Sequence, residues 1–202
     1  MRCKRVVLLL VLSVTSAACA SHTSRRPPVG VGFDREAETK AVYSAVLNGL
    51  YARDWLNREV KQWVIDPEIH AVIGGRDDLI RNRIEDARAD ALADFERPRP
   101  AGRVPPDLAP GLPVRWFTDV DFAALPKAGD GAGYGWAAFH QKFPGSPGHV
   151  TLSRIGFSVD GTEAIVEPGC WFASLGGART IVRLRKVHGN WQVKQRSQTA
   201  VS

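Results

Sequence analysis

The chain has 202 residues, of which 44% are hydrophobic and 24% are charged, and its net charge at pH 7 is +6. This length and composition are ordinary for one soluble globular domain with extensions, so no second domain is required. The basic residues form no block with interleaved aromatic residues, which argues against a nucleic-acid-binding surface and against nucleic-acid partners.

The first 18 residues have the organisation of a secretory signal peptide. A basic stretch with Arg2, Lys4 and Arg5 precedes an apolar run at 6–14 and a small-residue stretch at 15–18. This nine-residue run is too short for a transmembrane helix, which needs roughly 20 apolar residues to cross a ~30 Å hydrocarbon core. Removal of residues 1–18 takes away three of the 27 Lys and Arg and none of the 21 Asp and Glu, which leaves a net charge of +3.

Cys19 follows this stretch, and "SAAC" resembles the lipobox of bacterial lipoproteins, in which cleavage occurs before a cysteine that carries a diacylglycerol. We therefore expect Cys19 to be the lipidated first mature residue and a membrane anchor, because two or more acyl chains hold a protein stably. Ala20 is not the Asp that retains many such proteins at the inner membrane, so the resemblance implies the outer membrane in a Gram-negative source. The alternative is cleavage near Ala18 or Ala20, which would give a soluble periplasmic or secreted protein.

The N-terminal part of the mature chain predicts a tether and then a helix. Residues 20–32 are small, polar, Pro and Gly residues without apolar periodicity, so we expect residues 19–32 to form a flexible tether. From Asp34 to about Arg53 the pattern predicts a helix with acidic residues in its first turn. Its apolar face comprises Val42, Val46, Leu47, Leu50 and Tyr51.

The middle of the chain predicts short elements and an irregular connection. Residues 59–66 alternate as a strand that Pro67 should stop, and a second helix should begin near Asp77. Residues 97–113 hold six prolines, so we expect an irregular surface connection there. The apolar stripe of the second helix comprises Ile80, Ile84, Ala87, Ala91 and Phe95. A strand at 114–120 and a short helix at 135–143 follow.

Four strand-like runs end the chain: 149–159, 162–168, 179–187 and 190–196. Asp-Gly at 160–161 is a strong hairpin signal, and a loop containing Cys170 and the turn at 188–190 join the other runs. These features predict one α+β domain over residues 33–198, with N-terminal helices covering one face of an antiparallel meander. The specific expectation is a cystatin-like or nuclear-transport-factor-like (NTF2-like) fold.

The stretch from Gly135 to Val193 resembles a group of uncharacterised bacterial exported proteins and lipoproteins. Their pattern is approximately W-x-x-F-x-x-x-[YF]-P-G-S-x-G, L-S-R-[VI]-G-F, an A-[LI]-V run, a C-G-x-L-C-G turn and a final L-x-K-x-x-G-x-W hairpin. The resemblance implies export and a lipid anchor, but no activity. The matching residues are Trp136, Phe139, Phe143, Pro144, Gly145, Ser146, Gly148, Leu152, Ser153, Arg154, Gly156, Phe157, Ala164, Val166, Cys170, Gly189 and Trp191.

This chain departs from the group at the second cysteine, where it has Ser174. A close cysteine pair could form a disulfide or hold a metal, but Cys170 by itself can do neither. We therefore expect Cys170 to be a buried or half-buried thiol. Cys19 could pair with it only if Cys19 escapes lipidation.

The polar residues favour no catalytic or metal site. His140, Ser146 and His149 lie close in sequence, but no G-x-S-x-G elbow surrounds Ser146, and "FPGSPG" is better explained as a turn. The histidines lack H-x-x-x-H spacing, so no zinc site and no cofactor is predicted.

Three residues are candidates for binding. Arg154 either pairs with an acid such as Glu163 or Glu167, or caps a loop carbonyl; the sharper alternative is an anion or carboxylate site built on its forked donors. Trp171 and Phe172, in the expected loop, are candidates for an exposed adhesive pair, although core packing is the commoner role of such residues.

Two functional hypotheses remain. The first is a non-catalytic binding or accessory module of the cell envelope, with an envelope protein or a small ligand as partner. The second is a small periplasmic hydrolase or ligand-transforming enzyme. An enzyme should have a pocket with clustered ionisable groups and should place His140 or His149 beside Ser146 or an acid.

Lipidation of Cys19 gives the first prediction. The mature protein should partition into the detergent phase, and Cys19→Ala should release it to the soluble fraction or leave it unprocessed at the inner membrane, because each buried CH₂ contributes about 0.8 kcal/mol. The intact mass of the native protein decides: a chain that starts at Cys19 without added lipid mass would contradict the prediction.

Overall fold

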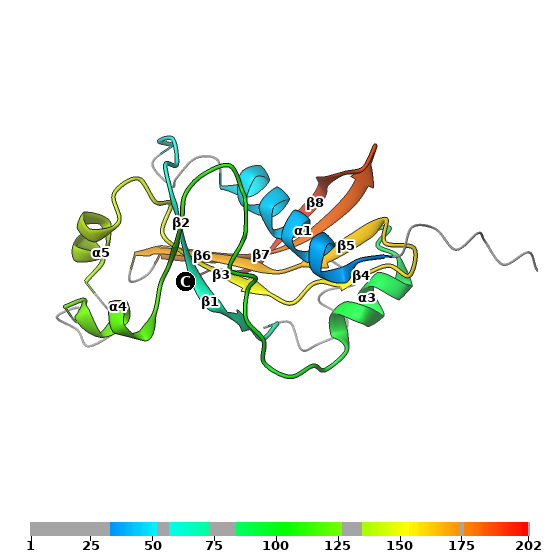
Figure 1. Cartoon of the computed structure of the whole chain (residues 1–202), viewed down its shortest axis with the longest axis horizontal. Coiled ribbons are helices and arrows are strands. Elements are labelled where there is room, and N and C mark those ends of the chain that lie inside the picture. The colour runs from blue at the N-terminus through cyan, green and yellow to red at the C-terminus, as the bar shows by residue number, and fades with distance from the viewer. Residues whose placement is uncertain (1–32, 52–56, 73–83, 127–134, 174–175, 202) are drawn as a thin grey trace, which may run out of the picture. The chain divides into compact units, whose positions relative to one another are not determined.

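A mixed sheet of eight strands organises the described residues (Figure 1). The computed structural model describes residues 33–51, 57–72, 84–126, 135–173 and 176–201, so the expected signal peptide and tether lie outside its described part. The strands are β1 (Trp63–His70), β2 (Val114–Trp116), β3 (His149–Ser153), β4 (Gly156–Phe157), β5 (Glu163–Val166), β6 (Pro168–Ala173), β7 (Gly176–Val187) and β8 (Asn190–Val201). The helices are α1 (Arg35–Leu50), α3 (Ala89–Glu96), α4 (Asp119–Ala124) and α5 (Trp136–Lys142).

The antiparallel meander is present and runs from β3 to β8. β3 pairs with β6, β4 with β5, and β7 pairs with β5 and β6 along one edge and with β8 along the other. Two hairpins fall where the sequence predicts them, because Gly161 and Gly189 supply the positive φ angles, 66° and 82°, that these turns require. β8 continues to Val201, past the expected domain end at residue 198.

The meander is not the whole sheet, and Pro67 does not stop the first strand. β1 runs through Pro67 to His70 and lies parallel to both β2 and β3. Its pairing with β3 shifts register between Ile65 and Ile69, so Pro67 falls where the ladder does not need its missing N–H group. The class is therefore α+β with a mixed, open sheet.

Helix α1 confirms its sequence signals. Asp34 caps it by accepting hydrogen bonds from the N–H groups of Glu36 and Ala37, at 3.0 and 3.2 Å. Val42, Val46 and Leu47 are buried as expected. Tyr43 is buried with them, and its hydroxyl donates to the carbonyl of Ser153 at 2.8 Å, which fixes α1 against the end of β3.

The second helix is shorter than its apolar stripe. α3 begins at Ala89, and residues 77–83 of the prediction lie outside the described residues. Ile84 comes before the helix, yet it packs in the same cluster as Ala91 and Phe95, against Ile165 and Ile181 of the sheet. The stripe therefore predicts the burial of Ile84, Ala91 and Phe95 correctly, although Ile84 lies outside the helix, and Ile80 falls outside the described residues.

Helices cover both faces of the sheet, so the expectation of one covered face is wrong. Ala164 and Val182 pack with α1, whereas Ile165 and Ile181, which point the other way along the same strands, pack with α3. The second face also carries α5 together with Phe117 and Leu125, the residues on either side of α4, which pack around Val64 of β1. Figure 1 shows α4 and α5 at one end of the sheet and α3 at the other.

The proline-rich connection is irregular, as predicted, but it is more than a surface segment. Val104 and Leu108 are buried in the cluster that contains α1. The N–H group of Val104 donates to the carbonyl of Pro67 at 2.9 Å. No helix in the described ranges is both long and apolar enough to cross a membrane.

The contact of α3 with β4 gives a stability prediction. A Cβ atom at position 156 would lie 2.4 Å from the backbone nitrogen of Phe95 and 2.5 Å from the carbonyl oxygen of Ala91. We expect Gly156→Ala to lower the free energy of unfolding by about 3 kcal/mol, because backbone atoms must shift. In the control, Gly102→Ala, the new Cβ meets only the end of the Ile69 side chain, at 3.3 Å. Equal urea midpoints for the two variants would contradict the packing described here.

Candidate functional site

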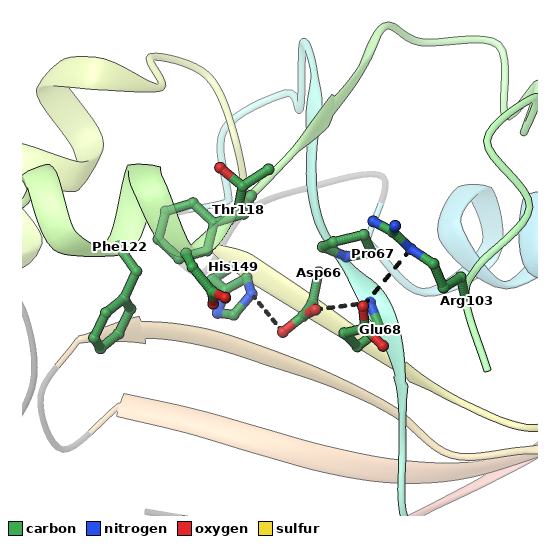
Figure 2. Close-up of a pocket in the computed structure, with 9 residues that line it drawn as sticks. Asp66, Pro67, Glu68, Arg103, Thr118, Phe122 and His149 are labelled. Atoms are coloured by element: carbon green, nitrogen blue, oxygen red, sulfur yellow. Dashed lines mark hydrogen bonds and ion pairs between the residues drawn. The ribbon is translucent and has the colours of Figure 1, made fainter. Parts of the chain in front are cut away.

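The main candidate site is a cavity of about 410 Å³ where β1, the end of β2 and the start of α4 meet (Figure 2). We call it the acidic cavity. Its lining residues are Asp66, Pro67, Glu68, Arg103, Phe117, Thr118, Asp119, Phe122 and His149.

Short-range hydrogen bonds fix the wall that follows β2. The N–H group of Phe117 donates to the carbonyl of Ile65 at 2.8 Å, which ties this wall to β1. Thr118 then caps α4 in a capping box: its hydroxyl accepts from the N–H of Asp121 at 3.4 Å, and the Asp121 carboxylate accepts from the N–H of Thr118 at 3.1 Å. Asp119 and Phe122 are therefore held at defined positions on the first turn of α4.

Asp66 lies between two histidines at the inner end of the cavity. Its Oδ2 atom is 2.8 Å from Nε2 of His70 and 3.7 Å from Nε2 of His149, and its Oδ1 atom accepts from the N–H of Glu68 at 2.8 Å. Burial alone would raise the pKa of Asp66, but the hydrogen bonds from His70 and Glu68 lower it below the usual value. Asp66 is therefore a carboxylate at neutral pH.

His149 forms part of the buried floor. Its side chain is 13% exposed, and its ring packs against Phe117 with centroids 4.6 Å apart. Burial lowers the pKa of His149 to about 4, and the attraction of Asp66 does not reverse this shift. The imidazole is consequently neutral at neutral pH.

The cavity runs from this buried floor to an exposed acidic rim. Phe117 is 4% exposed, whereas Thr118 and Asp119 are exposed and Phe122 is 51% exposed. Arg103 faces Glu68, with Nε 3.6 Å from Oε1. With His149 neutral, three carboxylates and one guanidinium give the lining a net charge of −2.

A second cavity of about 390 Å³ adjoins the first, and we call it the apolar cavity. The two cavities share Pro67, Arg103 and Thr118 among their lining residues. The other lining residues are Val104, Pro106 and Trp116.

Arg154 lies away from both cavities and caps a helix. Its Nε and Nη2 atoms donate to the carbonyls of Phe95 and Glu96 at 2.6 and 3.1 Å, at the C-terminal end of α3. The expected ion pair of Arg154 with Glu163 or Glu167 is therefore wrong, and the carbonyls that Arg154 caps belong to a helix and not to a loop. Glu163 and Glu167 pair with other arginines: Glu163 with Arg183 and Arg185, and Glu167 with Arg179.

Trp171 and Phe172 lie in β6 and not in a loop, which corrects that expectation. Both are half-buried. Trp171 pairs with Gly177 across the hairpin, where a Cβ atom would lie 2.1 Å from the indole. The carbonyl of Phe172 is 3.0 Å from Nε2 of His140. Neither aromatic side chain lines the acidic or the apolar cavity, so a binding role for the pair stays a prediction.

Cys170 also lies in β6, so the expected Cys170 loop is wrong, but its burial is confirmed. The thiol is 7% exposed and its Sγ atom is 3.8 Å from the carbonyl of Pro147. Burial raises its pKa to about 12. Ser174 and Cys19 fall outside the described residues.

The Ser-His combination is not assembled. Ser146 is buried, and its hydroxyl forms no hydrogen bond within the described residues. His140 instead faces the Phe172 carbonyl, and His149 faces Asp66.

Sequence reasoning missed most residues of the acidic cavity. Among the residues that line it, only His149 stands out in the sequence as a candidate site residue, and it does so for a serine–histidine hydrolase. One usable signal was present: Asp66 and His70 are four residues apart, on either side of Pro67, in a strand whose first three residues are apolar. Polar residues that interrupt such a strand beside a proline indicate a bulge and a possible site.

The described part of the chain contains no group of three His, Cys, Asp or Glu side chains arranged to hold a metal ion. Scans against protein-family models, curated proteins and solved structures each found no match.

His149 gives a prediction of pH dependence. Because its pKa falls from 6.5 to about 4 on folding, the folded state resists protonation. The contribution of His149 to the free energy of unfolding should be at its maximum above pH 6.5. It should decrease by about 3 kcal/mol as the pH falls toward 4. Urea titrations across this range measure the loss, which should be smaller in His149→Gln.

His188→Asn is the matched control, since it removes a histidine from an exterior turn and asparagine accepts the positive φ of 49° at that position. It should keep the wild-type slope. Asp66 does not confuse the measurement, because its lowered pKa affects stability below pH 3.8. Identical curves for wild type and His149→Gln would contradict the prediction.

Proposed function

We propose that this protein is a lipid-anchored bacterial cell-envelope protein whose domain binds a small ligand in the acidic cavity without transforming it. The observation that carries the proposal is the cavity itself, with a buried floor of Phe117 and His149 and ionisable groups converging on it. Concave sites with an aromatic lining and a few placed polar groups are typical of ligand binding.

The lining supports binding over catalysis. Its one hydroxyl, on Thr118, donates to Asp121 at 2.9 Å as part of the helix cap, so it is not poised as a nucleophile. A general base works best when its pKa is near the working pH, and a pKa of about 4 makes His149 a weak base.

One observation favours the alternative, a small hydrolase or ligand-transforming enzyme. His149 and Asp66 are 3.7 Å apart inside a cavity with clustered ionisable groups, which is an arrangement that an acid–base enzyme requires. Its test is turnover of a panel of chromogenic esters, phosphates and glycosides, with loss of any activity in His149→Gln. Activity of this kind would replace the binding proposal.

The anchor and the finer fold are part of the proposal. Lipidation at Cys19 rests on the order of basic, apolar and small residues in 1–18 and on the lipobox resemblance. A cystatin-like or NTF2-like arrangement is supported by α1, which packs on one face of the meander with β8 as a neighbour. The parallel strands β1 and β2 are an addition to that arrangement.

A blocked cavity tests the binding function. Asp119 is an exposed lining residue, so Asp119→Trp should fill the mouth without disturbing the core. A thermal-shift screen of a diverse small-molecule collection would first identify compounds that raise the melting temperature of the wild-type protein. We expect these compounds to leave the melting temperature of Asp119→Trp unchanged.

Val120→Trp is the matched control. Val120 is on the same helix, is 78% exposed and does not line the cavity, so this variant should respond like the wild type. A collection that yields no stabilising compound, or only compounds that act equally on both tryptophan variants, would contradict ligand binding at this site.

A further inference from the structure

We propose that the ligand of the acidic cavity is an amphiphilic amine, with its ammonium group in the acidic cavity and its apolar body in the adjoining apolar cavity. This inference rests on the binding function proposed above and specifies the chemical class of the ligand. Four features of the two cavities support it.

The first feature is charge. Asp66, Glu68 and Asp119 line the acidic cavity, and Arg103 is the one cation among its lining residues. Arg103 is paired with Glu68, and His70 contacts Asp66 from outside the lining, which leaves Asp119 as the lining carboxylate without a basic partner among the described residues. The lining has a net negative charge although the chain as a whole is basic, with a net charge of +6 including residues 1–18 and +3 without them. A cationic ligand therefore fits the cavity, and an anion would meet two carboxylates.

The second feature is the state of the two inner groups. Asp66 is a carboxylate, since its pKa is lowered, and it accepts from His70 and from the Glu68 N–H group. His149 is neutral, so it adds no positive charge to the floor. An ammonium group donates hydrogen bonds and accepts none, which suits a floor that presents a carboxylate.

The third feature is the aromatic wall. Phe117 and Phe122 stand edge to face, with ring centroids 6.4 Å apart, and Phe122 remains 51% exposed at the mouth. Ring faces attract cations, and an ammonium group within about 6 Å of a ring centre gains from this attraction. The same wall buries the carbon atoms next to the ammonium group.

The fourth feature is the apolar cavity beyond Pro67 and Thr118. Apart from the shared Arg103 and Thr118, it is lined by Pro67, Val104, Pro106 and Trp116. Figure 2 shows Arg103 on the other side of Pro67 from His149, and Arg103 lines both cavities. A molecule that extends across this boundary buries an apolar body against Trp116 while its charged end stays near Asp66.

A matched set of three probes tests the charge preference. Phenylbutylamine, phenylbutanol and phenylbutyrate share one apolar body and are cationic, neutral and anionic at pH 7. In calorimetric titrations of the purified protein, we expect the amine to bind about tenfold more tightly than the alcohol, and the acid to bind most weakly. Equal affinity for amine and alcohol, or a preference for the acid, would overturn the inference.

Charge-removing variants locate the interaction. Asp66→Asn and Asp119→Asn should each weaken phenylbutylamine binding several-fold and leave phenylbutanol binding unchanged. Glu36→Gln is the control for long-range charge, because Glu36 is an exposed residue of α1 that does not line the cavity. Since Asp119 is exposed on the rim, its variant tests the charge even if Asp66→Asn disturbs the fold. An equal loss in Glu36→Gln would overturn the assignment to this cavity.

The apolar body is tested by ligand length. Phenylbutylamine should bind more tightly than benzylamine, and Trp116→Leu should reduce this advantage without changing benzylamine binding. If no amine binds, but other compounds stabilise the wild-type protein and not Asp119→Trp, the inference is overturned and the binding function still stands. If no compound distinguishes Asp119→Trp from Val120→Trp, the binding function itself fails.

Discussion

The parallel pairing of β1 with β3 is the constraint on which the candidate site depends. It sets Val64 beside His149, and the register shift that follows it lets Pro67 occupy a strand without leaving a ladder hydrogen bond unmade. The same irregularity turns the carboxylate of Asp66 toward His149 and leaves Glu68 at the rim. β2 pairs in parallel with β1 as well. Phe117 and the start of α4, which follow β2 directly, therefore form the opposite wall of the cavity.

The second face of the sheet divides into two polar regions with different physical characters. Under α3, Glu163 is buried and accepts from the N–H of Arg88 at 2.7 Å and from Arg185 at 3.1 Å, so its charge is matched inside the protein. Such closed networks fix one packing arrangement and leave little for a ligand to satisfy. Near α4 the carboxylates of Asp66 and Asp119 face a cavity instead, and this contrast separates a structural region from a candidate binding region.

Features set by local chemistry could be predicted from the sequence. The start of α1 with its acidic first turn, the apolar face of α1 and the hairpins at Gly161 and Gly189 each depend on residues within a few positions, and each is confirmed. The parallel strands could not be predicted, because β1 and β3 are separated by about eighty residues whose pairing has no local signal. The site was missed for the same reason: Asp66, Phe117 and His149 come from three distant segments, and only their tertiary placement makes them neighbours.

The buried thiol of Cys170 makes it possible to measure how often the centre of this sheet opens. Its thiol lies in a central strand among α1 and the core strands, and its raised pKa keeps it protonated. A thiol of this kind reacts with alkylating reagents only when β6 separates from its neighbours, because the thiolate is the reactive form. The rate of labelling at Cys170 therefore reports the frequency of opening of the sheet centre, and the protein carries a natural probe for local unfolding at the strand next to β3.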